Sequence, residues 1–388
     1  MKQLVAIILA CSGLMVADAD DERIFLDASI NGRPVRFIFD TGAGVPFILF
    51  STAAQKLGLK VTPPPADNQL GPGQVAAGLT ELCDLQIART NLAARFSVVN
   101  IPGFLKWDAV GVLGWPAVSN NLFSVDFASH TFSFLTNLPA TSAGWVKLRI
   151  STNVDLLGLE LAVRHGRKDI LLLDSGSANG MALNAKAWQD WKSAHARQPV
   201  TLDAYYTPNM GLVIKEESWA EKISLGSLTL TKVPVMEAGS GEVALATSLQ
   251  TTFAATLGFA ALKRLDVIFD GRRGLAYLRP KSAPPMPYEH DRLGAVFVPE
   301  NLSSDDLVAR VVVGSPAYRA GIRNADVLLK IGGLDTTRWR TDPQVLPLSR
   351  FWNGPAGTRL VLTLKRGETT FPSTVTLQNI LPPDDSKN

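Results

Sequence analysis

Residues 37–42 read Phe-Ile-Phe-Asp-Thr-Gly, and residues 171–176 repeat the pattern as Leu-Leu-Leu-Asp-Ser-Gly. Each stretch contains an apolar triplet, then an aspartate, a hydroxyl residue and a glycine. Apolar runs bounded by turn residues are typical of buried strands, and glycine gives the turn its conformational freedom. Each stretch therefore predicts a carboxylate, Asp40 or Asp174, on a sharp turn at the end of a buried strand.

Two further landmarks follow each copy in the same order. Leu113-Gly114 in the first copy corresponds to Leu257-Gly258 in the second. Twelve residues after each of these glycines an aspartate closes an apolar strand, at Asp126 and Asp270. The separation from turn aspartate to downstream glycine is 74 residues in the first copy and 84 in the second, which a ten-residue loop insertion explains. The chain therefore contains an internal repeat, and its two aspartate loops could face each other.

Two carboxylates at hydrogen-bond distance cannot both ionise cheaply, so they share a proton. The ionised member can take a proton from a water between them, while the protonated member donates to a substrate carbonyl. Asp40 and Asp174 in this arrangement could hydrolyse an amide without a covalent intermediate. The alternative is that both loops are ordinary turns, because Asp-Thr-Gly and Asp-Ser-Gly are common turn sequences.

Residues 22–281 resemble the aspartic proteases of the retropepsin and pepsin clan. The resemblance rests on Phe39–Ala43 with Gly111–Gly114, and on Leu173–Ser177 with Leu257-Gly258. It implies a mainly β fold with two pseudo-symmetric lobes and a substrate cleft between them.

The resemblance also assigns boundaries and roles. Lobe 1 spans residues 22–145 and lobe 2 spans residues 146–281. Asp40 and Asp174 would be the catalytic pair. The residues that would lock the two loops together are Thr41, Gly42, Ser175 and Gly176.

Family members close a β-hairpin flap over the substrate, and each lobe has one candidate for it. Residues 71–78 are the candidate in lobe 1, which lacks the flap tyrosine of the pepsins, and Tyr205 to Gly211 are the candidate in lobe 2. Ser177 follows the second loop where the first has Ala43. A hydroxyl at that position can donate to the carboxylate and lower its pKa, so we expect Asp40 to be the more readily protonated member.

The Pro-rich residues 282–288 indicate a linker, and residues 289–383 resemble a PDZ domain, a small α+β module. The resemblance rests on the order Val311–Ala317, Ala320–Ile322, Asp326–Gly333 and Gly357–Leu364. The turn Leu293-Gly294-Ala295 would offer backbone N–H groups to a peptide C-terminal carboxylate, and the next strand would pair with the peptide. Alternatively, the groove is covered or used only for docking within the chain.

Local signals predict a hairpin turn at Asn31-Gly32 and short helices at Ser51–Leu57 and Ala185–Ala194.

The chain has 388 residues, of which 46% are hydrophobic and 19% charged, so packed cores are expected and global disorder is excluded. The net charge of +3 gives no reason to expect a nucleic-acid partner. Four scattered histidines lack metal-ligand spacing. We therefore expect neither a metal nor an organic cofactor.

Residues 1–19 have the pattern of a signal peptide, because the apolar run Leu4–Ala17 follows a lysine and ends in Ala17-Asp18-Ala19. The run is too short for an integral membrane span. Cys11 in a loose lipobox is an alternative anchor. We expect export to the periplasm or medium, leaving Cys83 as the sole thiol.

These patterns predict an exported aspartic endopeptidase that acts on polypeptides, with a PDZ domain for a substrate or partner. The alternative is a non-catalytic peptide-binding or scaffold protein with the same fold. Assembly of the cleft between two chains is unnecessary, because one chain carries both motifs.

Overall fold

The computed structural model describes residues 23–63, 76–87, 90–101, 108–152, 155–162, 168–207, 211–238, 253–281, 288–301, 303–342 and 344–381. Several predicted features lie outside these ranges: the signal peptide with Cys11, residues 282–287 of the linker and residues 71–75 of the first flap candidate. No helix in the described ranges is long and apolar enough to cross a membrane.

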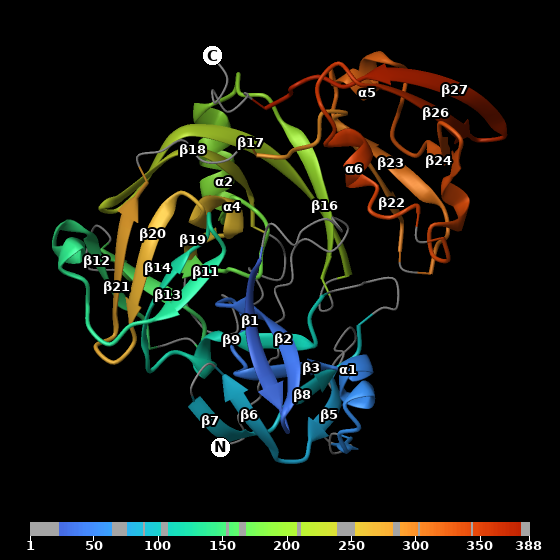
Figure 1. The fold of residues 1–388 in the computed structure, drawn as a ribbon. Coiled ribbons are helices and arrows are strands. Elements are labelled where there is room, and N and C mark those ends of the chain that lie inside the picture. Colours follow the sequence, from blue (N-terminus) through green and yellow to red (C-terminus); the bar gives the residue numbers. More distant parts are fainter. Residues whose placement is uncertain are drawn as a thin grey trace.

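Strands dominate the structure, which confirms the mainly β fold, and they form three sheets within the described residues (Figure 1). The helices are short. They are α1 (Ser51–Lys56), η3 (Trp115–Ala117), η4 (Ala140–Gly144), α2 (Ala185–Ala194), α4 (Phe259–Leu262), α5 (Pro316–Arg319), η6 (Thr336–Arg338) and α6 (Ser349–Trp352). The two helices predicted near residues 51 and 185 are thereby confirmed.

The first sheet lies wholly in lobe 1. Its described strands are β1 (Ile24–Ile30), β2 (Arg33–Asp40), β3 (Phe47–Phe50), β4 (Val61–Thr62), β5 (Ala76–Thr80), β6 (Cys83–Ile87), β7 (Thr90–Ala94), β8 (Ser97–Val99) and β9 (Gly111–Gly114). Their spatial order is β4-β5-β8-β3-β9-β2-β1-β6-β7. The Asn31-Gly32 turn joins β1 to β2 with positive φ at both residues, as a two-residue hairpin requires.

The second sheet is larger and contains strands from both lobes. Its described strands are β10 (Leu122–Asp126), β11 (Thr131–Phe134), β12 (Val146–Ile150), β13 (Gly158–Ala162), β14 (Lys168–Leu173), β15 (Met181–Leu183), β16 (Thr201–Thr207), β17 (Gly211–Leu225), β18 (Leu228–Glu237), β19 (Phe253–Leu257), β20 (Leu265–Asp270) and β21 (Leu275–Pro280). The order is β11-β10-β20-β21-β12-β13-β14-β19-β15-β18-β17-β16. β10 and β11 precede residue 145 in the chain but belong to the second sheet. The lobe boundary predicted at residue 145 therefore does not separate the two sheets.

The third sheet forms the C-terminal domain, at the orange and red end of the chain in Figure 1. Its described strands are β22 (Ala295–Pro299), β23 (Leu307–Val311), β24 (Val327–Ile331), β25 (Leu334–Asp335), β26 (Arg359–Arg366) and β27 (Thr369–Thr376). The order is β22-β23-β24-β26-β27, with β25 paired to β24, so β22 is an edge strand.

Strand pairing reproduces the internal repeat. In lobe 1, β2 pairs in parallel with β9, β9 pairs antiparallel with β3, and β3 pairs in parallel with β8. In lobe 2, β14, β19, β15 and β18 repeat these pairings in the same order. The helices α1 and α2 follow the corresponding strands β3 and β15.

The two copies meet at the antiparallel pair β10–β20, where Leu122 lies opposite Asp270 and Asp126 lies opposite Asp266. The offset between the copies carries Leu122 to Asp266 and Asp126 to Asp270. Exchanging the copies therefore leaves this pairing unchanged. A pseudo-two-fold axis passes through the ladder.

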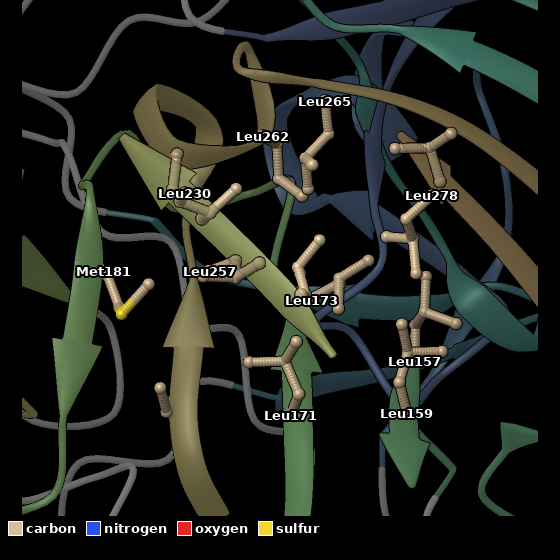
Figure 2. Close-up of a cluster of buried hydrophobic side chains, with 14 of the residues drawn as sticks. Leu157, Leu159, Leu171, Leu173, Met181, Leu230, Leu257, Leu262, Leu265 and Leu278 are labelled. Atoms are coloured by element: carbon tan, nitrogen blue, oxygen red, sulfur yellow. The ribbon is translucent and has the colours of Figure 1, made fainter. Parts of the chain in front are cut away.

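The two apolar triplets of the repeat are core residues. Leu171 and Leu173 pack with Leu157, Leu159 and Leu257 in a large buried cluster that contains residues of both lobes (Figure 2). The lobe 1 triplet is divided, because Phe37 and Ile38 belong to the lobe 1 core whereas Phe39 belongs to the large cluster. The Phe39 ring packs against Phe123 and Phe132, so it links the first aspartate loop to the second sheet.

Candidate active site

Asp40 is the last residue of β2, and strands on both sides position it. On one side β1 pairs Ile24 with Phe39, and on the other side β9 pairs Gly114 with Asp40. Ile38 lies on the same face of the strand as Asp40 and is also buried, so the strand directs the carboxyl group into the interior.

Asp174 follows β14 directly and occupies the equivalent place in lobe 2. Leu173 lies opposite Leu257 of β19, and the Asp174 amide donates to the Leu257 carbonyl at 2.9 Å. In both copies the aspartate thus emerges where a buried strand ends beside a parallel neighbour.

The structure brings the two carboxyl groups together. A Cβ atom on Gly42 would lie 2.5 Å from the Asp174 carboxyl carbon, and one on Gly176 would lie 2.4 Å from the Asp40 carboxyl carbon. Each carboxyl thus rests against the glycine of the opposite loop, and the Asp174 side chain is within hydrogen-bond reach of Asp40. Asp40 is 0% exposed and Asp174 is 2% exposed, so neither is an ordinary surface turn residue.

Reciprocal hydrogen bonds join the two loops. The Thr41 amide donates to Ser175 Oγ and the Ser175 amide donates to Thr41 Oγ1, each at 3.0 Å. Thr41 Oγ1 donates to the Leu173 carbonyl at 2.7 Å, and Ser175 Oγ donates to the Phe39 carbonyl at 2.9 Å. Each hydroxyl therefore accepts one hydrogen bond from the opposite loop and donates one to the strand that precedes that loop. The pseudo-two-fold axis relates the two bonds of Thr41 to the two bonds of Ser175.

The two oxygens of the Asp40 carboxyl group differ in their hydrogen bonding. Asp40 Oδ1 accepts from the Gly42 amide at 2.7 Å, but Asp40 Oδ2 is buried and has no hydrogen-bond partner within the described residues. An ionised carboxylate only accepts hydrogen bonds, so the neighbouring Asp174 can satisfy Asp40 Oδ2 only when a proton lies between them. Burial raises the pKa of the Asp40 carboxyl to about 6, against the Gly42 amide, the Asp174 side chain and the charge of Arg23, which lower it.

The loops differ in the residue that follows the glycine. The Ser177 amide donates to Asp174 Oδ1 at 3.1 Å, beside the Gly176 amide at 3.0 Å. The Ala43 and Ser177 amides each donate to the backbone carbonyl of their own loop's aspartate at 3.3 Å, so the bond to the carboxyl oxygen is the one that the Ala43 amide lacks. The amide, rather than the expected hydroxyl, is the group of Ser177 that reaches the carboxylate.

Sequence reasoning did not single out Arg23, which is 4% exposed and has a positive charge that lowers the pKa of Asp40. The position of the Asn31-Gly32 turn is the signal that could have identified Arg23, because the turn fixes which residues of the hairpin lie opposite each other. Because Ile24 lies opposite Phe39, the preceding residue falls beside Asp40.

The predicted peptide-binding loop of the C-terminal domain uses its N–H groups within the chain. Leu293 and Ala295 are buried in the domain core, and Gly294 has φ +71°. The amides of Leu293 and Gly294 donate to Asp291 Oδ1 at 2.8 and 3.1 Å. The N–H groups that we expected a peptide carboxylate to use are therefore occupied by a side chain of this protein.

No group of three or more acidic, histidine or cysteine side chains that could hold a metal ion occurs within the described ranges. Cys83 is buried in β6 as a free thiol.

Comparison with protein families gives two matches. Residues 26–117 match a family described as "Aspartyl protease", and residues 307–366 match a family described as "PDZ domain". The first match contains the Asp40 loop and β9 but ends before Asp174. The chain thus contains an aspartyl protease domain and a PDZ domain, as the sequence resemblance implied.

A search of curated proteins gave no match. Among solved structures, the chain is similar to an aspartic proteinase from Irpex lacteus, with 13% identity and a TM-score of 0.43. The similarity covers 68% of this chain and 96% of that one.

Proposed function

We propose that the protein is an aspartic endopeptidase in which Asp40 and Asp174 activate one water molecule against a peptide bond. The observation that carries the proposal is the pair of buried carboxyl groups on symmetry-related loops, in which Asp40 Oδ2 has no hydrogen-bond partner among the described residues. This geometry supports a pair that shares a single proton.

The reaction follows from that shared proton. The ionised carboxyl accepts a proton from the water, whose oxygen then attacks the peptide carbonyl carbon. The protonated carboxyl donates to the carbonyl oxygen, so charge does not accumulate on it. Collapse of the tetrahedral intermediate breaks the C–N bond, and a proton returns to the leaving nitrogen. The locked loops assist because they keep both carboxyl groups in place throughout.

The test is cleavage of an unfolded protein and of a peptide pool between pH 3 and 8. We expect Asp40→Asn and Asp174→Asn each to lower the rate at least about 100-fold, as loss of a general acid or base does. Asp270→Asn is the matched control, because Asp270 is also buried but lies at the end of β20 and outside the pair. A statine-type transition-state analogue should inhibit the parent protein.

Activity that survives both substitutions would eliminate the mechanism. No activity of the parent protein at any pH would favour the non-catalytic peptide-binding function instead.

We also propose that the protein is exported and that its PDZ domain binds a polypeptide substrate or partner. The apolar run ending in Ala17-Asp18-Ala19 supports export, and the PDZ match supports peptide binding. Fractionation of cells that express the full chain, with Ala19→Asp as a cleavage-blocked variant, tests the first part. Recovery of the parent protein in the cytoplasm at full length would contradict it.

A further inference from the structure

The loop before β22 contains a buried carboxyl group. Asp291 is 4% exposed, and its Oδ1 accepts from the amides of Leu293 and Gly294. Two successive N–H groups thus converge on one side-chain carboxyl oxygen, which is the arrangement that the terminal carboxylate of a peptide would otherwise complete.

A second contact ties this carboxyl group to the protease lobe. Thr201, the first residue of β16 in lobe 2, is fully buried, and its hydroxyl lies 2.8 Å from Asp291 Oδ2 and 3.0 Å from the Asp291 backbone carbonyl. The single hydroxyl hydrogen of Thr201 can be donated to only one of these two oxygens at a time, but both contacts hold the carboxyl group turned into the loop.

The strand that follows the loop is covered as well. Ala295 and Phe297 point into the PDZ core, so strand alternation turns Val296 and Val298 away from it. These two valines are nevertheless only 3% and 5% exposed. β16 lies against β22, so an edge strand of lobe 2 borders the edge strand to which a peptide would add (Figure 1).

We propose that Asp291 is an internal ligand of the PDZ domain, whose carboxyl group fills the amide cradle formed by the N–H groups of Leu293 and Gly294 while Thr201 of lobe 2 holds it there. The groove is therefore closed to peptides that are recognised by a free C-terminal carboxylate. Such a peptide would bring its C-terminal carboxylate close to the Asp291 carboxyl group. It would find no free N–H donor in the loop, because Asp291 already accepts from these amides. This deepens the peptide-binding part of the proposed function and does not depend on protease activity.

Either protonation state of Asp291 can fill the cradle. Burial raises the pKa of Asp291 to about 7, against the Thr201 hydroxyl and the backbone amides of the loop, which lower it. The amides reach Oδ1, which accepts hydrogen bonds in the carboxylate and in the neutral acid alike when the proton is on Oδ2.

The substitutions Asp291→Ala and Asp291→Asn make a matched pair. Alanine empties the cradle. Asparagine retains an oxygen for the amides and an NH₂ group for Thr201, so it should keep the cradle filled. Both variants are made in the full chain, and circular dichroism checks that each is folded.

The first readout is backbone amide exchange by NMR without any peptide. In the parent and in Asp291→Asn, the Leu293 and Gly294 amides should be protected. In Asp291→Ala they should exchange at least about tenfold faster, since a tenfold change corresponds to one modest hydrogen bond. Equal exchange rates in the parent and in Asp291→Ala would overturn the proposal. Because the measurement contains no peptide, it tests the internal ligand even if the protein binds neither peptide pool.

The second readout is binding of a randomised octapeptide pool with a free C-terminal carboxylate, compared with the same pool amidated. The parent should show no preference beyond about threefold between the two pools, because its amide cradle is filled and β16 borders the edge of β22. A tenfold preference for the free acid in the parent would refute the internal ligand. Because no peptide bond is cleaved in either readout, failure here leaves the protease proposal standing.

Discussion

Replacing Ser175 with alanine removes a hydroxyl group at the centre of the two locked loops. Ser175 Oγ accepts from the Thr41 amide at 3.0 Å and donates to the Phe39 carbonyl at 2.9 Å. Alanine leaves both backbone groups without these partners in a site where Ser175, Thr41 and Phe39 are all 0% exposed. An unpaired buried polar group costs about 1–3 kcal/mol, so we expect the free energy of unfolding to fall by about 2–6 kcal/mol. That is a large part of the total stability of about 5–15 kcal/mol that is usual for a domain.

Urea unfolding of the full chain, followed by tryptophan fluorescence, measures this loss. Ser177→Ala is the matched control, because Ser177 is in the same loop and is 6% exposed, but its hydroxyl makes no hydrogen bond within the described residues. We expect the control to change the free energy of unfolding by less than about 1 kcal/mol. Equal losses in the two variants would refute the reasoning, since the cost would then come from loop packing and not from the unpaired groups.

Three further predictions concern the pair and its surroundings. Burial raises the pKa of Asp40 from its ordinary value of 3.8 to about 6, so kcat/KM should fall about tenfold per pH unit above pH 6. The stability that this group contributes should be present below about pH 4 and lost as the pH rises through 6. A flat rate profile from pH 5 to 8 would contradict this. Gly42→Ala should lower kcat/KM about 100-fold, because its Cβ would lie 2.5 Å from the Asp174 carboxyl carbon, whereas Gly144→Ala meets nothing within 4 Å and should leave the rate unchanged. Phe123→Ala, in the β10–β20 ladder, should cost about 3–5 kcal/mol in urea unfolding, since the ring is fully buried against other aromatic rings; a cost below about 1 kcal/mol would argue against that packing.

The features that sequence reasoning predicted correctly depend on a few adjacent residues. Asn31-Gly32 is a hairpin turn because both residues adopt positive φ, and α2 begins after Asn184, whose side chain accepts from the Ala187 amide. The internal repeat could also be read from the chain, because matching landmarks in the same order need no knowledge of their contacts.

The features that sequence reasoning missed depend on contacts between distant segments. The membership of β10 in the second sheet is decided by its pairing with β20, and no local pattern in residues 122–126 specifies that partner. Arg23 gains its influence on Asp40 only through the β1–β2 ladder.

The aspartate pair and the PDZ loop show which features the sequence alone determined and which depended on the tertiary structure. The amino-acid order alone placed Asp40 and Asp174 at the ends of apolar strands beside turn glycines, because strand burial and turn formation act over neighbouring residues. Only the tertiary structure set the two carboxyl groups against each other's loops and put Asp291 in the amide cradle with Thr201 behind it. The reason is physical: proton sharing and hydrogen bonding act over a few ångströms in space, and the folded chain, not the linear one, determines which groups come that close.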